Sequence, residues 1–454
     1  MGTALFVIGI VVMFFGSISF IVPNVDAIRG PAFFISWLVT ELAAQFLVIN
    51  IIVLAVLFSL GGYRSIFGMV GTILILLNCA ILVFHIVNST KAKSILKEGL
   101  VNGLTIDDEK GFNRETIEEE FEKNCASIKN GLIFPFPIKP SKVKRVKNIS
   151  YVDDNLRRHK LDIYTVNNEQ SSTKEDSKES DSLDLNATDT TNSNTDGQDL
   201  TDVDLPLAAD NPTQLKPVVM VVHGGAWVIG QKENQGLPHI HTLVNHGYVC
   251  VAINYRLSPK ATWPDHITDV KSALVWVKEN IANFGGDKDN IALLGMSAGG
   301  HLVSLAALSM NDPQYQTGFE DKDTSFKACV PIYPVLDLTN SLKVQSRQLI
   351  SMLSRFVFKT SLRSDNQNWE NASPLFRNME NAPPMFILHG SKDLLVPIQE
   401  SIEFVNRYRQ NNNIVCFANL TGAQHAFEIF WSYRARKSVA AVLTFLNFMC
   451  KECL

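Results

Sequence analysis

The stretch NIALLGMSAG at residues 290–299 is the segment of this chain that most directly indicates its fold. Its first half is a short apolar run that predicts a strand, and residues 298–310 after it have helical apolar spacing. Between them lies the pattern G-x-S-x-G, whose glycines allow a tight strand-to-helix turn that lifts a serine hydroxyl above the sheet edge. The start of the helix favours developing negative charge. The stretch therefore predicts an exposed, nucleophilic Ser297 at the end of a strand.

Strand-like and helix-like segments alternate on both sides of this stretch. The β-branched or apolar runs at 217–222, 248–255, 326–333, 385–389 and 414–420 predict strands, and 267–284 and 437–449 predict helices. Two shorter runs, 146–152 and 160–166, predict a hairpin that opens the sheet. This alternation predicts an α/β fold with a mostly parallel, eight-stranded sheet and helices on both faces.

A second glycine motif, HGGAW at residues 223–227, follows the strand 218–222. Acyl transfer passes through an oxyanion, and backbone N–H groups must point at that oxygen to stabilise it. Glycines let the chain approach closely enough, so Gly224 and Gly225 are candidate donors, together with Ala298 just after the serine. We expect His223 to hold this loop by a hydrogen bond and Trp227 to line the substrate pocket.

A nucleophilic serine requires a base, and the base requires an acid that orients it. His425 lies in the loop after the strand 414–420, and Asp393 lies in the loop after the strand 385–388. Both loops leave the carboxyl ends of strands, where open α/β sheets place their sites. Asp337 is the main alternative acid because it also follows a strand, but it comes earlier in the chain.

These motifs resemble those of the α/β-hydrolase esterases and lipases related to hormone-sensitive lipase. The resemblance covers residues 146–450 apart from a polar tract, and it is carried by HGG at 223–225, YRL at 255–257 followed by Pro259, and GMSAGGH at 295–301. It implies the α/β-hydrolase fold and a serine carboxylesterase or lipase activity. In that activity Ser297, Asp393 and His425 form the catalytic triad, and no metal or organic cofactor is required.

The motifs fit more than one class of substrate. Ala226 stands where many family members have a third glycine, and HGGAW instead resembles the membrane-bound prenylcysteine methylesterases and is similar to the aryl formamidases. The alternatives are therefore a prenylcysteine methylesterase or an amidase or formamidase on the same triad. A hydrolase-fold binding module without activity is the alternative of another class, against which the intact triad pattern argues.

Three apolar runs precede the catalytic region, at residues 4–22, 33–60 and 65–87. A membrane helix requires about 20 mostly apolar residues, so residues 1–90 predict three transmembrane helices. Glu41 precedes a stretch that is already long enough to span, which places it at the membrane interface. The expected partners are a membrane and a small-molecule or lipid ester, and such an ester, if apolar, would concentrate in the bilayer.

Charged residues around the three runs favour opposite orientations of the catalytic domain. Lys91, Lys93 and Lys97 follow the third run and favour a cytosolic catalytic domain. Arg64 favours the opposite orientation, as would any glycosylation of the sequons at Asn148, Asn186, Asn371 and Asn419. The expected location is an endomembrane such as that of the endoplasmic reticulum, with a multi-pass anchor.

The remaining segments complete the domain plan. Residues 91–145 are predicted to bridge the membrane helices and the catalytic domain at 146–454, and the polar tract at about 167–216 is predicted to be a disordered insertion between the second and third strands. The net charge of -4 and the lack of a large basic tract argue against a nucleic acid partner. The seven cysteines show no metal-ligand spacing.

Overall fold

Eight strands form one sheet in the computed structural model of the protein, which describes residues 1–454 except 21–25, 106–111, 129–141, 155, 167–213 and 452–454. The strand order is β1-β2-β4-β3-β5-β6-β7-β8. β1 pairs antiparallel with β2, β2 pairs antiparallel with β4, and all other neighbours are parallel. The bounds are β1 Val143–Ser150, β2 Lys160–Val166, β3 Lys216–Val222, β4 Val249–Ile253, β5 Gly286–Met296, β6 Ala328–Ile332, β7 Met385–Gly390 and β8 Val415–Leu420.

The predicted mostly parallel, eight-stranded sheet is thus confirmed. Its central strands are β-branched runs because they are buried on both faces: in β3, Val218, Met220 and Val222 enter one core, while Val219 and Val221 enter the other. The predicted polar insertion at about 167–216 lies outside the described residues up to residue 213.

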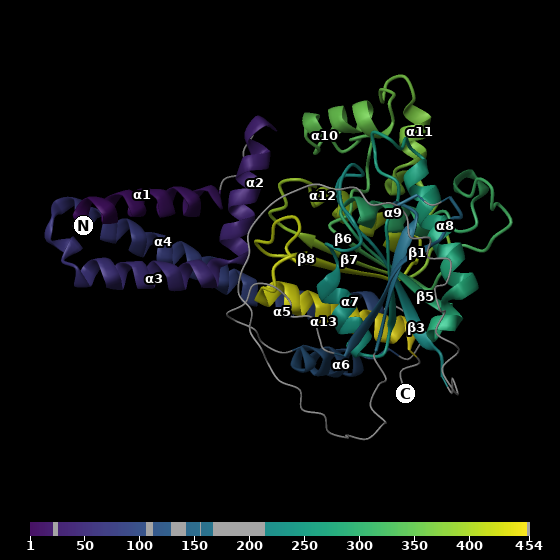
Figure 1. Ribbon diagram of the computed structural model, residues 1–454, viewed down its shortest axis with the longest axis horizontal. Coiled ribbons are helices and arrows are strands. Elements are labelled where there is room, and N and C mark those ends of the chain that lie inside the picture. The colour runs from purple at the N-terminus through teal and green to yellow at the C-terminus, as the bar shows by residue number, and fades with distance from the viewer. Residues whose placement is uncertain (21–25, 106–111, 129–141, 155, 167–213, 452–454) are drawn as a thin grey trace, which may run out of the picture.

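Helices cover both faces of the sheet (Figure 1). On one face lie α8 (Asp265–Asn280), α9 (Ala298–Ala307) and α12 (Gln399–Gln410), whose apolar side chains join the first core. On the other face lie α5 (Ala92–Leu104), α6 (Arg114–Ser127), α7 (Leu237–Asn245) and α13 (Tyr433–Cys450). All parallel strands end at the same edge of this sandwich, so the loops after β3, β5, β7 and β8 meet there.

The segment 91–145, expected to bridge membrane and enzyme, also contributes a layer of the catalytic fold. A Cβ on Gly103 in α5 would lie 2.6 Å from the Cα of Cys416 in β8, so the helix backbone lies directly on the sheet. In α6, Asn124 donates to Thr444 Oγ1 of α13 at 2.9 Å. The packing of α5 and α6 on the sheet was not expected, because both helices also have charged, exposed faces. Their buried apolar residues are Leu96, Leu100, Ile117 and Phe121.

Four further helices precede α5: α1 (Gly2–Ile18), α2 (Asp26–Glu41), α3 (Ala43–Ser59) and α4 (Ile66–Thr90). α1, α3 and α4 form a bundle beside the catalytic fold, and α2 stands between the bundle and the sheet (Figure 1). The second predicted span, 33–60, is not one straight helix, because α2 and α3 are bent by 78°. Glu41, expected at the membrane interface, is buried within the protein and paired with Arg434 of α13.

By length and composition, one helix among the described residues could cross a membrane, Ile66–Leu104, and a second candidate arises if the bent pair α2–α3 counts as one span. α1 has 17 residues, which is short of the about 20 that a membrane helix requires. The bundle nonetheless exposes large apolar side chains on every helix, among them Val7, Phe14, Ile52, Phe58, Phe67 and Leu76.

Candidate active site

Ser297 lies at the sharp turn between β5 and α9. Its backbone has φ 55° and ψ -118°, a region that non-glycine residues rarely adopt, so the turn holds it in a strained conformation. The turn requires glycine at its flanks: a Cβ on Gly295 would lie 2.2 Å from the carbonyl oxygen of Gly299, and a Cβ on Gly299 would lie 2.2 Å from that of Val222 in β3. The sequence therefore folds into an elbow that presents the Ser297 hydroxyl above the sheet.

His425 and Asp393 reach the same point from two other strand ends. His425 Nε2 lies 2.8 Å from Ser297 Oγ, and His425 Nδ1 lies 2.7 Å from Asp393 Oδ2. The three predicted residues are thus joined in one hydrogen-bonded chain, although they are 128 and 32 residues apart in sequence. In this arrangement, His425 can accept the proton of Ser297 while its other nitrogen donates to the carboxylate.

The carboxylate of Asp393 is fully buried but well supplied with donors. The backbone N–H groups of Leu395 and Val396 donate to Oδ1 at 2.9 and 2.8 Å. Burial alone would raise the pKa of Asp393, but the charge of His425 and hydrogen bonds from His389 and His425 outweigh it and hold the pKa below its ordinary value. The group therefore stays ionised, as the orienting acid of a histidine base must.

The alternative acid, Asp337, is used differently. Its Oδ1 accepts hydrogen bonds from the backbone N–H and the hydroxyl of Thr339, and its Oδ2 accepts one from Ser341. These contacts close the loop after β6. No hydrogen bond joins Asp337 to a histidine within the described part of the chain, so the structure favours Asp393.

The glycine loop after β3 differs in part from expectation. The backbone N–H of Gly224 donates to Gln235 Oε1 at 2.7 Å, so it is not free to hold an oxyanion, contrary to the prediction for Gly224. The N–H groups of Gly225, Ala226 and Ala298 donate no hydrogen bond to any described residue. Gly225 has φ +116°, and a Cβ there would lie 2.2 Å from the carbonyl oxygen of Ile229, so the loop requires this glycine.

A buried polar network behind His425 was missed by sequence reasoning. Tyr333 donates to Glu428 Oε1, Gln235 Nε2 donates to both Glu428 and Tyr333, and the Tyr333 ring centroid lies 4.3 Å from that of His425. Burial raises the pKa of Glu428 above its ordinary value, against the hydrogen bond from Tyr333. The network joins the loops that carry Gly224 and His425, and no motif indicates such a contact between side chains so far apart in sequence.

The aromatic and histidine residues of the motifs occupy fixed positions. Trp227 is buried, and its Nε1 donates to His301 Nδ1 at 3.3 Å, while His301 Nε2 lies 2.7 Å from the carbonyl oxygen of Ala372. His223 Nδ1 lies 2.7 Å from the carbonyl oxygen of Gly224, and its ring stacks on Tyr255. Burial lowers the pKa of His223 to about 4, which keeps it neutral as a loop-holding residue.

A cavity of about 450 Å³ opens beside Ser297 and His425. Three parts of the chain line it. The loops after the strands contribute Ala226, Trp227, Val335, Leu394, Leu395 and Val396; the segment at 338–378 contributes Ser346, Gln348, Leu349 and Met352; and α2 contributes Gly30 and Pro31. The lining is mostly apolar, which suits an apolar acyl or alcohol group. The contribution of α2 was not expected.

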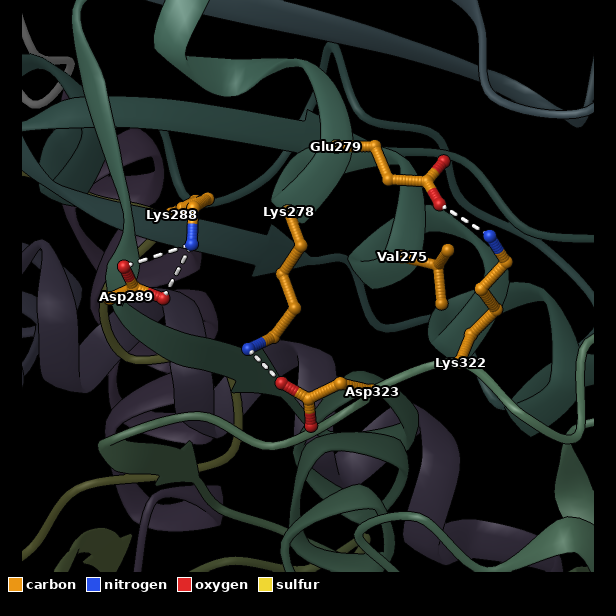
Figure 2. A pocket seen from close by; sticks show the side chains of 7 residues that line it. All are labelled: Val275, Lys278, Glu279, Lys288, Asp289, Lys322 and Asp323. Atoms are coloured by element: carbon orange, nitrogen blue, oxygen red, sulfur yellow. Dashed lines mark hydrogen bonds and ion pairs between the residues drawn. The ribbon is translucent and has the colours of Figure 1, made fainter.

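A second hollow, of about 230 Å³, has a different character. Figure 2 shows that its lysines each pair with a carboxylate: Lys278 with Asp323 at 2.7 Å, Lys322 with Glu279 at 2.9 Å, and Lys288 with Asp289 at 3.0 Å. The pairs compensate their charges, so the hollow offers no uncompensated group to a ligand. Among the described residues, no three His, Cys, Asp or Glu side chains are placed to hold a metal ion.

The elbow makes a direct prediction for Gly299. Changing Gly299→Ala places a Cβ 2.2 Å from the carbonyl oxygen of Val222, so α9 must move away from β3 and carry Ser297 with it. We expect a loss of stability of about 1–3 kcal/mol and a fall in ester turnover, measured by thermal unfolding and by initial rates. Gly247→Ala is the control, since a Cβ there meets nothing within 4 Å; it carries only the cost of a positive φ, about 1 kcal/mol, and turnover should persist.

Comparison with known proteins places these features among esterases. A family model described as BD-FAE matches residues 202–408. The chain is 46% identical over 235 residues to the probable carboxylic ester hydrolase LipM of Mycobacterium tuberculosis, a match that covers 52% of this chain and 54% of LipM. It is 32% identical over 241 residues to an arylesterase of Saccharolobus solfataricus, which covers 50% of this chain and 74% of the arylesterase.

Two more similarities bear on the substrate and the fold. The chain is 31% identical over 224 residues to the probable isoprenylcysteine alpha-carbonyl methylesterase ICMEL1 of Oryza sativa subsp. japonica, covering 46% of this chain and 50% of that protein. A truncated carbohydrate esterase from gut microbiota has a similar fold, with a TM-score of 0.53 at 19% identity over 69% of this chain and 99% of that one. The chain therefore spans only about half the length of LipM and ICMEL1.

Proposed function

The chain belongs to the family of α/β-hydrolase esterases, and we propose that it hydrolyses carboxylic esters with Ser297 as nucleophile, His425 as base and Asp393 as orienting acid. The observation that carries this proposal is the hydrogen-bonded chain from Ser297 Oγ through His425 to Asp393, at the mouth of an apolar cavity. A strained serine, a correctly spaced imidazole and a buried carboxylate are the parts that acyl transfer requires.

The reaction follows from the positions of these groups. Ser297 Oγ attacks the ester carbonyl carbon as His425 Nε2 takes its proton, and the resulting oxyanion accepts hydrogen bonds from backbone N–H groups. We assign these donors to Gly225, Ala226 and Ala298, since Gly224 donates to Gln235. Collapse of the intermediate expels the alcohol, which takes the proton from His425. Water then attacks the acyl-enzyme by the same route and releases the acid.

We also propose that the N-terminal helices associate the enzyme with a membrane. Two features support this: α4, an apolar helix of 25 residues within the candidate span Ile66–Leu104, and the large apolar side chains that α1, α3 and α4 expose. Many large apolar side chains exposed on a protein surface mark a membrane or protein contact. Membrane association places the cavity near apolar esters, and the lining of Leu349, Met352 and Leu394 suits them.

A second candidate function is the hydrolysis of one particular ester, the methyl ester of an isoprenylcysteine, by the same three residues. The relative ICMEL1 is named a methylesterase of isoprenylcysteine. A prenylcysteine methyl ester has a long apolar chain, which the apolar cavity and the exposed apolar helices would suit. An amidase or formamidase activity is also compatible with the triad, because His425 can protonate an amine leaving group as well as an alcohol.

A substrate panel tests these assignments. We expect the purified full-length chain in detergent micelles to hydrolyse 4-nitrophenyl acetate, butyrate and decanoate, and to hydrolyse the matched 4-nitroanilides far more slowly. A preference for a farnesylcysteine methyl ester over these esters would favour the methylesterase. Hydrolysis of the anilides at rates equal to the esters would favour an amidase, and failure on every substrate would favour a binding module.

A further inference from the structure

One face of α2 is bound to the loop that carries His425. Gln424 Nε2 donates to Ser36 Oγ at 2.8 Å, and Trp37 Nε1 donates to the carbonyl oxygen of Ala426 at 3.0 Å, so α2 contacts both neighbours of His425. At the end of the helix, Glu41 accepts from Ser432 at 2.9 Å and pairs with the buried Arg434. The pair joins α2 to α13, and loss of either partner would leave the other charge buried without a counter-charge.

The same face reaches the other side of the site. Phe33 of α2 is buried in a small apolar cluster with Ala32 and Leu394, the residue that follows Asp393, and its ring centroid lies 6.4 Å from that of His425. Gly30 and Pro31, one turn earlier, line the cavity beside Ser297. α2 is therefore one wall of the candidate active site, although it belongs to the apolar N-terminal segment.

The opposite face of α2 is apolar and exposed. Ile28, Phe34 and Leu38 are 51%, 59% and 37% exposed, and helical spacing places them on the side away from Phe33, Ser36 and Trp37. At Leu42 the chain bends by 78° into α3, so α2 lies across the end of the bundle and not along it (Figure 1). α3 and α4 expose apolar side chains as well, such as Val48 and Val83.

A helix across the end of a membrane bundle lies at the depth of the lipid headgroups, with its apolar face toward the acyl chains. We propose that α2 lies in the membrane interface and admits an ester from the bilayer to Ser297, passing Pro31 into the cavity. The substrate class is thus an ester with a long apolar chain dissolved in lipid. This inference rests on the proposed esterase function and specifies where its substrate comes from.

The test compares one enzyme on two esters of the same fluorogenic alcohol. The full-length protein is reconstituted in phosphatidylcholine vesicles and assayed with 4-methylumbelliferyl oleate in the bilayer and with 4-methylumbelliferyl acetate in water. Changing Phe34→Glu or Leu38→Glu places a charge on the exposed face of α2, which weakens its contact with lipid. We expect the ratio of the oleate rate to the acetate rate to fall about tenfold.

The control is Leu156→Glu, an equally drastic change at a side chain that is 48% exposed and does not line the Ser297 cavity. It should leave the ratio unchanged, and vesicle flotation ensures that equal amounts of each variant are compared. If both α2 variants keep the wild-type ratio, the proposed role of α2 is overturned. If the wild type hydrolyses neither ester, the esterase function itself fails, and the inference with it.

Discussion

Changing Ser297→Ala is expected to lower kcat for ester hydrolysis by about 10⁶-fold. The hydroxyl is the only group of the proposed triad that bonds to the substrate carbon, and His425, 2.8 Å away, has no second nucleophile to activate at that position. The remaining rate would come from the oxyanion donors and from substrate binding alone. The measurement is the initial rate with 4-nitrophenyl butyrate, together with labelling by a fluorophosphonate, which reacts with activated serines.

Ser304→Ala provides a matched control in the same helix. Ser304 is buried in α9, and its hydroxyl donates to the carbonyl oxygen of Gly300 at 2.8 Å, so its removal tests whether loss of any serine hydroxyl in α9 matters. We expect Ser304→Ala to keep its labelling and turnover. Retention of more than a tenth of the wild-type rate by Ser297→Ala, in a protein freed of contaminating esterase, would exclude the proposed nucleophile.

Changing Asp393→Asn is expected to lower kcat by about 10⁴-fold with little effect on KM. Oδ1 accepts two backbone hydrogen bonds, from Leu395 and Val396, so the amide oxygen of asparagine would stay on that side. The amide NH₂ would then face His425 Nδ1, where the carboxylate oxygen now accepts. His425 would have to carry its proton on Nε2, and it could no longer take the proton of Ser297.

The same substitution at Asp337, the alternative acid, provides the comparison for Asp393→Asn. Asp337→Asn disturbs the hydrogen bonds to Thr339 and Ser341, so we expect it to lower the free energy of unfolding, while kcat of the folded enzyme changes less than tenfold. Single-turnover rates measured below the melting temperature of each variant separate the two effects. The opposite pattern, a large loss of kcat in Asp337→Asn and a small one in Asp393→Asn, would assign the orienting acid to Asp337.

Much of the sheet and the triad geometry could be predicted because their signals are local. G-x-S-x-G after a β-branched run, and acidic and histidine residues after later strands, each indicate their position by a short pattern. Parallel strands then bring such loops to one edge wherever the chain crosses over. The hydrogen bond from the Gly224 N–H to Gln235 could not be predicted, because the Gln235 side chain reaches this loop only in the folded protein.

The α/β fold, the Ser297 elbow and the candidate partners Asp393 and His425 could be predicted from the sequence, because a run of neighbouring residues indicates each strand and turn. The packing of α5 and α6 on the sheet, and the place of α2 as a wall of the candidate active site, became apparent only in the folded protein. The physical reason is that an apolar run has the same hydropathy whether lipid or protein buries it. Contacts such as Glu41–Arg434, between residues 393 apart in sequence, hold α2 against the catalytic fold.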